Sequence, residues 1–344
     1  MFVYILKRIL LMVPTLLGAL TITFIVMQFV PGGPVEQILA EAQAGASAGG
    51  EGYRAGKDLD KKQIEELKKL YGFDKPAHVR YGEMLVNFAS FNLGRSFMHN
   101  KDVWELIKEK LPVSISLGLW SFLLAYLVSV PLGIAKAVRE GSRFDTFTTL
   151  VVLAGYAIPG FVLGILLIVL FAGGTFYDWF PLRGLTSDNW EEMAWPARIA
   201  DYFWHLTLPL ICLTIGAFAV TTMLTKNTFV EEIRKQYVLV ARAKGLSQQR
   251  VLYKHIFRNA LIPLVTGFPA AFVGAFFAGS VLIETLFSLD GLGLLGYEAV
   301  IRRDYPVVLG SLYLFTLIGL VVKLVSDLLY RVVDPRVQFG SVAK

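Results

Sequence analysis

Six long apolar runs constrain the fold of this chain more than any other feature of its sequence. Each run approaches the ~20 residues with which an α-helix crosses about 30 Å of hydrocarbon. The runs are Ile9–Val30, Pro112–Ala135, Thr146–Ala172, Leu206–Thr225, Ala260–Ile283 and Pro306–Leu324. Their only charged residue is Lys323, near the end of the last run, where a lysine can extend its ammonium to the interface. The sequence therefore predicts an all-α polytopic membrane protein with six transmembrane helices.

The positions of the charges argue against a nucleic-acid ligand, although the net charge is +6. The stretch 229–257 is basic and carries Arg234, Lys235, Arg242, Lys244, Arg250 and Lys254 against two glutamates. The stretch 173–205 is acidic and carries Asp178, Asp188, Glu191, Glu192 and Asp201 against two arginines. The positive-inside rule then places both termini and the 231–263 loop in the cytoplasm. An even number of spans agrees with that topology.

The runs also divide the chain into regions. Residues 1–30 form a cytoplasmic N-terminus and an uncleaved first span, because the apolar run is longer than the core of a signal peptide. Residues 31–111 form an extracytoplasmic insert with helices expected from Asp60 and over Ala77–Ala89. Residues 112–330 form a core of five helices that includes a cytoplasmic loop at 226–259. Residues 331–344 form a cytoplasmic tail.

No residue pattern supports catalysis by this chain. Gly291–Gly296 matches G-x-G-x-x-G, but the strand that must precede a dinucleotide site is not expected here. The sequence has no G-x-x-x-x-G-K-[ST] loop and no histidine or cysteine cluster with metal-ligand spacing. The lone Cys212 reads as a packing residue. We therefore expect no catalytic, cofactor-binding or metal-binding residue.

Two features of the sequence allow more than one interpretation. The aromatic stretch 173–205 fits an interfacial belt, or a contact with an extracytoplasmic partner. Small residues at helical spacing, such as Gly160 with Gly164 and Ala270 with Gly274 and Ala278, fit helix packing, a subunit interface or a substrate pathway.

The basic loop contains a predicted helical elbow. Val230–Lys244 reads as one helix, Gly245 interrupts it, and Ser247 is placed to cap a second helix that ends near Asn259. Basic residues surround four apolar side chains of this segment: Tyr237, Val240, Leu246 and Val251. A loop that only sets topology explains the charges, but it explains neither the Gly-Ser break nor the apolar side chains. We therefore expect another protein to dock here.

These residues resemble a known family. Ala241–Ser247 (ARAKGLS) and Arg258–Pro263 (RNALIP) look like the coupling loop of permease subunits in ATP-binding-cassette (ABC) importers for peptides. Further matches to this oligopeptide/dipeptide permease family are Tyr71–Pro76, Leu93–Phe97, Leu111–Ser114, Gly291–Gly293, Arg303–Val307 and Asp334–Arg336. Within the family, 171–185 and 224–245 look closest to the Yej-type branch of B subunits.

The resemblance implies a type I importer permease in the bacterial inner membrane. It implies separate ATP-binding subunits, which would bind the nucleotide, a second homologous permease chain in a heterodimer, and a periplasmic peptide-binding protein. It also assigns ATPase coupling to Ala241, Arg242, Ala243, Lys244, Gly245, Leu246 and Ser247. Gly245 would shape the turn, Ala241, Ala243 and Leu246 would pack against the ATPase, and Arg242 and Lys244 would orient it. One departure is Leu239, which stands where the wider importer pattern has a glutamate.

Two other classes of function remain. An ion-gradient-driven secondary transporter commonly carries acidic or histidine residues inside its spans, which these runs lack. Neutral oxygens can bind Na⁺, so that rival stays open at this point. A passive membrane scaffold is the third possibility.

Overall fold

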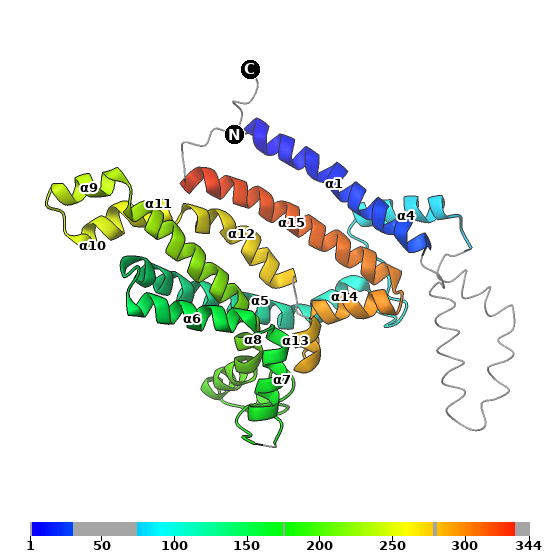
Figure 1. Cartoon of the computed structure of the whole chain (residues 1–344). Coiled ribbons are helices and arrows are strands. Elements are labelled where there is room, and N and C mark those ends of the chain that lie inside the picture. Colours follow the sequence, from blue (N-terminus) through cyan, green and yellow to red (C-terminus); the bar gives the residue numbers. More distant parts are fainter. Residues whose placement is uncertain (1, 30–73, 175, 278–280, 334–344) are drawn as a thin grey trace. The chain divides into compact units, whose positions relative to one another are not determined.

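The computed structural model describes residues 2–29, 74–174, 176–277 and 281–333. These residues are predominantly helical, and among them no strand forms beyond an isolated bridge between Arg95 and Asp102. The described α-helices are α1 (Phe2–Phe29), α4 (Ala77–Ala89), α5 (Val103–Val138), α6 (Arg143–Ala157), α7 (Gly160–Phe171), α8 (Trp195–Ile233), α9 (Gln236–Ala243), α10 (Gln248–Val251), α11 (Phe257–Ala260), α12 (Ile262–Phe277), α13 (Val281–Leu286), α14 (Leu292–Ile301) and α15 (Tyr305–Val333) (Figure 1).

Four described helices are long and apolar enough to cross a membrane: Val3–Phe29, Val103–Val138, Trp195–Ile233 and Tyr305–Leu329. Two pairs of bent helices, α6 with α7 and Gln248–Ala260 with Ile262–Gly274, raise the number to six if each pair is one span. A chain with this many apolar helices is a polytopic helical membrane protein.

The prediction of one helix over Thr146–Ala172 was wrong. Two helices occupy this run, and α6 and α7 meet at an angle of 91°. Pro159 has no backbone N–H to donate, and Ile158 before it is extended at φ −88°, ψ 117°. A Cβ on Gly160 would lie 2.7 Å from the carbonyl oxygen of Cys212, so the glycine lets α7 start against α8. Gly160 therefore serves packing within the chain.

The fifth run is bent at its start, where the helical segment Gln248–Ala260 meets Ile262–Gly274 at an angle of 49°. Gly274 faces open space, because a Cβ on it would meet nothing within 4 Å. Ala278 lies outside the described residues.

The second run starts earlier than predicted. α5 begins at Val103 rather than Pro112, because the Asp102 carboxylate accepts a hydrogen bond from the Trp104 N–H at 2.8 Å and starts the helix. The first turns of α5 therefore belong to the region that we assigned to the insert. Of the two helices expected in that insert, Ala77–Ala89 is confirmed as α4, which follows Pro76. The helix from Asp60 lies outside the described residues.

The chain divides into two compact units. Unit 1 comprises residues 1–5, 111–294 and 319–344, and unit 2 comprises residues 6–110 and 295–318. In unit 2, Phe88 of α4 packs on Tyr313 of α15 with a ring-centroid distance of 5.1 Å. In unit 1, a core joins α5, α7, α8 and α13 through Leu117, Ala172, Leu206, Leu208, Leu210, Cys212, Ile283, Phe287 and Leu289. The buried position of Cys212 confirms its reading as a packing residue.

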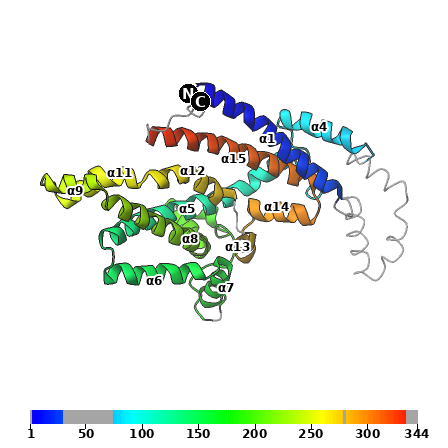
Figure 2. The same cartoon turned by 45° about the horizontal axis from the view of Figure 1, so that its top comes forward.

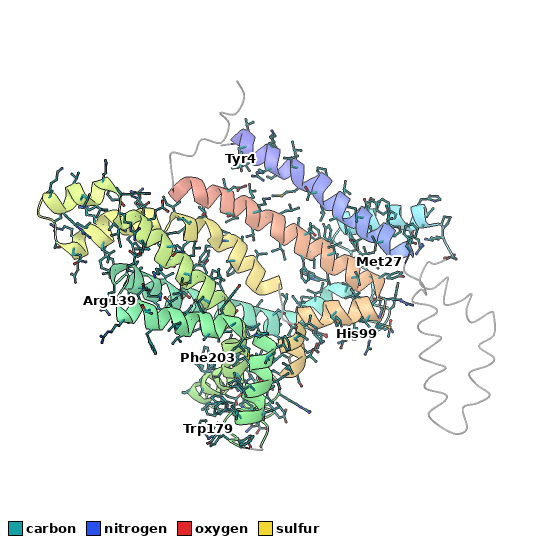
Figure 3. All side chains as sticks on the ribbon, in the orientation of Figure 1. Tyr4, Met27, His99, Arg139, Trp179 and Phe203 are labelled. Carbon is teal, nitrogen blue, oxygen red and sulfur yellow. The ribbon has the colours of Figure 1, made fainter. Side chains whose placement is uncertain are left out.

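Aromatic side chains gather beside α7 in unit 1, where Figure 3 labels Trp179 and Phe203. Phe203 packs on Trp120 with a centroid distance of 4.8 Å, and Trp120 donates to the hydroxyl of Tyr202 at 3.0 Å. Trp179, in contrast, is 55% exposed. Tyr202 therefore packs against the core of unit 1, while Trp179 faces outward.

Candidate functional site

The predicted elbow exists, at one end of unit 1 (Figures 1 and 2). Gly245 has φ +79°, a backbone conformation that strongly favours glycine. The Ser247 side chain accepts a hydrogen bond from the Arg250 N–H at 3.4 Å and caps α10. α10 continues through a π-helical segment, Leu252–Ile256, into α11, which ends at Ala260. The second arm therefore ends within one residue of the predicted Asn259.

The first arm differs from the prediction, because Val230–Lys244 is not one helix. α8 ends at Ile233, Lys235 is extended at ψ 149°, and α9 begins at Gln236. Glu232 explains the local geometry, since it contacts the Lys235 ammonium and accepts a hydrogen bond from the Tyr237 hydroxyl at 2.7 Å. Burial and this hydrogen bond raise the pKa of Tyr237 to about 12.

The inner face of the elbow is apolar and packs on the rest of unit 1. A buried cluster joins α5, α8 and both arms through Ala137, Phe229, Val238, Ala241, Val251, Ile256 and Ala260. Ala241 is 7% exposed and Val251 is 1% exposed. The expectation that these two side chains face a partner is therefore corrected, because they hold the two arms together from within.

The outer face of the elbow carries apolar and basic side chains. Leu239 is 61% exposed and Val240 is 53% exposed. Beside them, Arg242, Ala243 and Lys244 are exposed, and Leu246 is half-buried. Exposure of Leu239 was not predicted from the sequence, although its position next to Val240 on a short helix is consistent with it. This surface can form an apolar contact ringed by cations on another protein.

The G-x-G-x-x-G segment has a structural role that its pattern alone did not suggest. Glu284 is 1% exposed, and its carboxylate accepts a hydrogen bond from the Leu294 N–H at 2.7 Å, at the start of α14. A Cβ on Gly291 would lie 2.8 Å from the Glu284 carboxyl carbon, so the glycine makes room for this carboxylate. Burial raises the pKa of Glu284. The glycine-rich turn thus binds a carboxylate of its own chain at a helix N-terminus.

Two sequence motifs that lie far apart in the chain meet in unit 2. Asp304, 2% exposed, accepts hydrogen bonds from the Ser96 hydroxyl at 2.5 Å and from the N–H of Phe97 at 3.1 Å. The Met98 N–H donates to the same carboxylate at 3.3 Å. Leu93–Phe97 and Arg303–Val307 therefore form one hydrogen-bonded structure rather than two separate sites. Tyr71–Gly72–Phe73 and Asp334–Arg336 lie outside the described residues.

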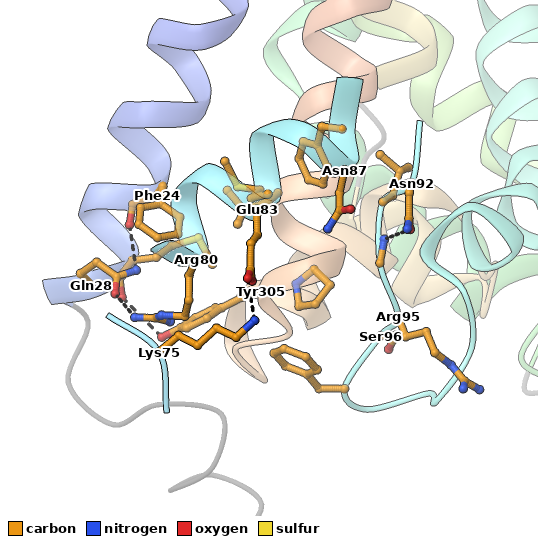
Figure 4. A pocket seen from close by; sticks show the side chains of 18 of the residues that line it. Phe24, Gln28, Lys75, Arg80, Glu83, Asn87, Asn92, Arg95, Ser96 and Tyr305 are labelled. Atoms are coloured by element: carbon orange, nitrogen blue, oxygen red, sulfur yellow. Dashed lines mark hydrogen bonds and ion pairs between the residues drawn. The ribbon is translucent and has the colours of Figure 1, made fainter. Parts of the chain in front are cut away.

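Unit 2 also contains an open cavity of about 590 Å³, lined by residues of α1, α4, the loop 92–100 and the start of α15 (Figure 4). Lys75 and Glu83 form an ion pair at 2.6 Å, and Arg80 donates to Gln28 at 2.7 Å along its wall. Phe24, Phe88 and Tyr305 supply its aromatic lining. Among the described residues, no group of three acidic, histidine or cysteine side chains could hold a metal ion.

Several known proteins are similar to this chain in sequence or in fold. The family model of the binding-protein-dependent transport system inner membrane component matches residues 129–339, which include the elbow. The peptidoglycan transport system permease protein YejB of Agrobacterium fabrum is 54% identical, over 98% of this chain and 98% of that protein. The oligopeptide transport system permease protein AppB of Bacillus subtilis is 33% identical, over 98% of this chain and 99% of that protein. An inward-facing structure of the MetNI methionine ABC transporter shares the fold with a TM-score of 0.50, at 16% identity over 67% of this chain and 97% of that one.

Proposed function

The chain belongs to the family of binding-protein-dependent transport system inner membrane components, and from this premise we propose that it is the permease subunit of an ABC importer for peptides. The permeases of this family are transport components without enzymatic activity of their own. The relatives named above transport peptidoglycan and oligopeptides, so peptides, including those released from peptidoglycan, are the proposed substrates. The resemblance to the Yej-type branch is confirmed by the 54% identity to YejB.

The observation that carries this proposal is the geometry of the elbow. Val238, Ala241 and Val251 pack together on the inner face of its two arms, while Leu239 and Val240 remain exposed on the outer face. A protein surface rarely keeps large apolar groups together unless something covers them. The elbow follows directly from α8, which is one of the long apolar helices. A partner bound to the outer face could therefore transmit its movement to a membrane-spanning helix.

We assign the residues of the elbow as follows. Gly245 shapes the turn, Ser247 caps the second arm, and Ala241 packs beneath the surface. Ala243 and Leu246 contact the ATP-binding subunit together with the exposed Leu239 and Val240, while Arg242 and Lys244 orient it. A glutamate at position 239 plays no part, because this chain has leucine there. Nucleotide binding belongs to the partner, since this chain lacks the phosphate-binding loop.

The proposed assembly has further parts. A second, homologous permease chain forms a heterodimer with this one, and a periplasmic binding protein delivers the peptide. The chain crosses the bacterial inner membrane six times, with α6–α7 and α10–α12 as bent spans. Both termini and the 226–259 loop face the cytoplasm, which the excess of arginine and lysine in that loop supports. The 31–111 region faces the periplasm.

Substitution of Gly245 by valine tests the assignment of the elbow. A Cβ at this position would meet nothing within 4 Å, so the effect comes from the backbone, where φ +79° costs a non-glycine residue roughly 1–2 kcal/mol and a β-branched residue more. We expect ATP-driven peptide uptake to fail while membrane insertion persists. Gly245→Asn is the matched control, because asparagine adopts this conformation readily. Uptake by the valine variant at the wild-type rate would refute the coupling role of this turn.

The rival function, an ion-gradient-driven secondary transporter, has no support from the comparisons. The family model describes a component that depends on a binding protein. The shared fold is that of an ABC transporter.

A further inference from the structure

A carboxylate shared by three helices lies close to the base of the elbow. Asp145, in the first turn of α6, is 5% exposed. Its Oδ1 lies 3.1 Å from the Nζ of Lys136 on α5, and its Oδ2 lies 2.7 Å from the Nζ of Lys226 on α8. The Gly141 N–H also donates to Oδ2, at 3.2 Å. One side chain therefore joins α5, α6 and α8, although Asp145 and Lys226 are 81 residues apart in sequence.

The two lysines are held very differently. Lys136 is fully buried, and its ammonium also donates to the Asp145 carbonyl at 2.9 Å and to the hydroxyls of Thr148 at 2.9 Å and Thr149 at 2.7 Å. An ammonium has three protons, so these contacts satisfy it completely. Within the described part of the chain, the Lys226 ammonium has Asp145 as its partner, and its side chain is 16% exposed. Lys136 thus fixes Asp145 to α5 and α6, while Lys226 adds α8 through one ion pair.

The helices cross tightly beside this ion pair. A Cβ on Gly133 of α5 would lie 2.6 Å from the Cβ of Thr225 and 2.8 Å from the carbonyl oxygen of Thr222, so α5 and α8 nearly touch. Lys226 directly follows Thr225 in sequence, so the ion pair lies next to this crossing.

The crossing connects directly to the elbow. Ala137, next to Lys136, and Phe229, one turn after Lys226, both belong to the buried cluster that holds Val238 and Ala241. A displacement of the elbow therefore reaches α8 within one helical turn of Lys226.

The charge balance at the site affects the strength of the Lys226 contact, because two ammonium groups share one carboxylate. The surplus positive charge makes the Lys226 contact the easier of the two to break.

We propose that the Lys226–Asp145 ion pair is a latch that holds α8 against α5 and α6 and opens when the ATP-binding subunits move the elbow. The inference rests on the proposed function and adds a positioning role for Lys226 in coupling. Asp145 and Lys136 form the fixed half of the latch. Lys226, at the beginning of the segment that leads to the elbow, is the half that moves.

Lys226→Gln is the variant of choice, because it leaves Asp145 paired with Lys136 and removes the surplus charge. The complete complex, with its ATP-binding subunits, second permease and binding protein, is reconstituted in proteoliposomes. ATP hydrolysis is measured with and without binding protein loaded with peptide. We expect Lys226→Gln to assemble, to hydrolyse ATP without binding protein several-fold faster than wild type, and to lose most of the stimulation. Lys226→Arg should retain the stimulation, and Lys101→Gln, which breaks an exposed pair with Glu109, should match wild type.

A cysteine variant separates coupling from folding. In Lys226→Cys, with cysteine-free partner subunits, the only other thiol in the sequence of this chain is Cys212, which is buried. Modification with aminoethyl methanethiosulfonate rebuilds an ammonium and should restore the stimulation, whereas the neutral methyl reagent should not. The modification should also proceed several-fold faster with MgATP than without nucleotide. Equal stimulation ratios in wild type and Lys226→Gln, or a modification rate that ATP does not change, would overturn the latch. If the wild-type complex takes up no peptide, the proposed function itself fails.

Discussion

At the scale of single residues, buried charges in this chain are held by backbone turns and by one another. Glu284 accepts from the Leu294 N–H inside the glycine-rich turn, and Asp304 accepts from Ser96, Phe97 and Met98. Each carboxylate therefore joins two segments of the chain. Backbone N–H groups supply hydrogen bonds to both buried carboxylates.

Glu284 predicts a pH dependence of stability. Burial raises its pKa in the folded protein above the ordinary value of 4.5, so between these two pKa values the folded state binds more protons than the unfolded state. The contribution of Glu284 to stability is therefore complete below the ordinary pKa, and it is lost as the pH rises through the raised one. We expect the thermal unfolding temperature in detergent to fall less steeply with pH in Glu284→Gln than in wild type.

Glu83→Gln is the control for replacing a glutamate elsewhere in the chain, because the Glu83 side chain is 51% exposed and lies outside the glycine-rich turn. Parallel pH profiles for wild type and Glu284→Gln would show that the carboxylate in the turn keeps its ordinary pKa.

At the scale of elements, helix contacts depend on glycines placed where two backbones meet. Gly133→Ala would place a Cβ 2.6 Å from the Thr225 Cβ and should destabilise the protein by about 1–3 kcal/mol through overpacking of α5 against α8. Gly216→Ala on α8 is the matched control. Its Cβ would meet nothing within 4 Å, and alanine favours the helix by up to ~1 kcal/mol. Thermal unfolding of the two variants should therefore shift in opposite directions, and equal shifts would contradict the tight crossing.

Local sequence signals predicted those elements whose limits are set by local chemistry. α4 matches its prediction because Pro76 fixes its start and its apolar spacing is short and regular. Gly245 and Ser247 predicted the turn and cap of the elbow for the same reason. The 91° bend at Pro159 was missed, since an apolar run tolerates proline and the fit of Gly160 against Cys212 is tertiary.

The orientation of side chains could not be read from the sequence. Ala241 and Val251 were predicted to lie at the surface, but they are buried in a cluster with residues of α5 and α8. The sequence did not indicate that Lys136 and Lys226 share Asp145, because this carboxylate is 81 residues from Lys226 in the chain. Hydropathy patterns indicate which residues are removed from water, but they do not indicate which residues contact one another.

At the scale of the whole molecule, the described apolar helices and the family membership define a multi-pass inner membrane protein. In the proposed cycle, the ATP-binding subunits bind the outer face of the elbow. Their motion is then transmitted along α8 into the membrane. In this proposal, ATP hydrolysis by a partner protein supplies the free energy, and the permease converts the closure of that partner into a rearrangement of spans. Peptide movement across the bilayer should stop whenever hydrolysis by that partner stops.

The most direct measurement of this central claim is peptide uptake into proteoliposomes that contain this chain, its partner permease and the ATP-binding subunits, with peptide-loaded binding protein on the opposite side from ATP. The account predicts uptake that requires ATP, stops when the ATP-binding subunits are inactivated by mutation, and continues when ionophores dissipate ion gradients. Uptake that persists with inactive ATP-binding subunits and collapses with ionophores would contradict the account and identify a secondary transporter.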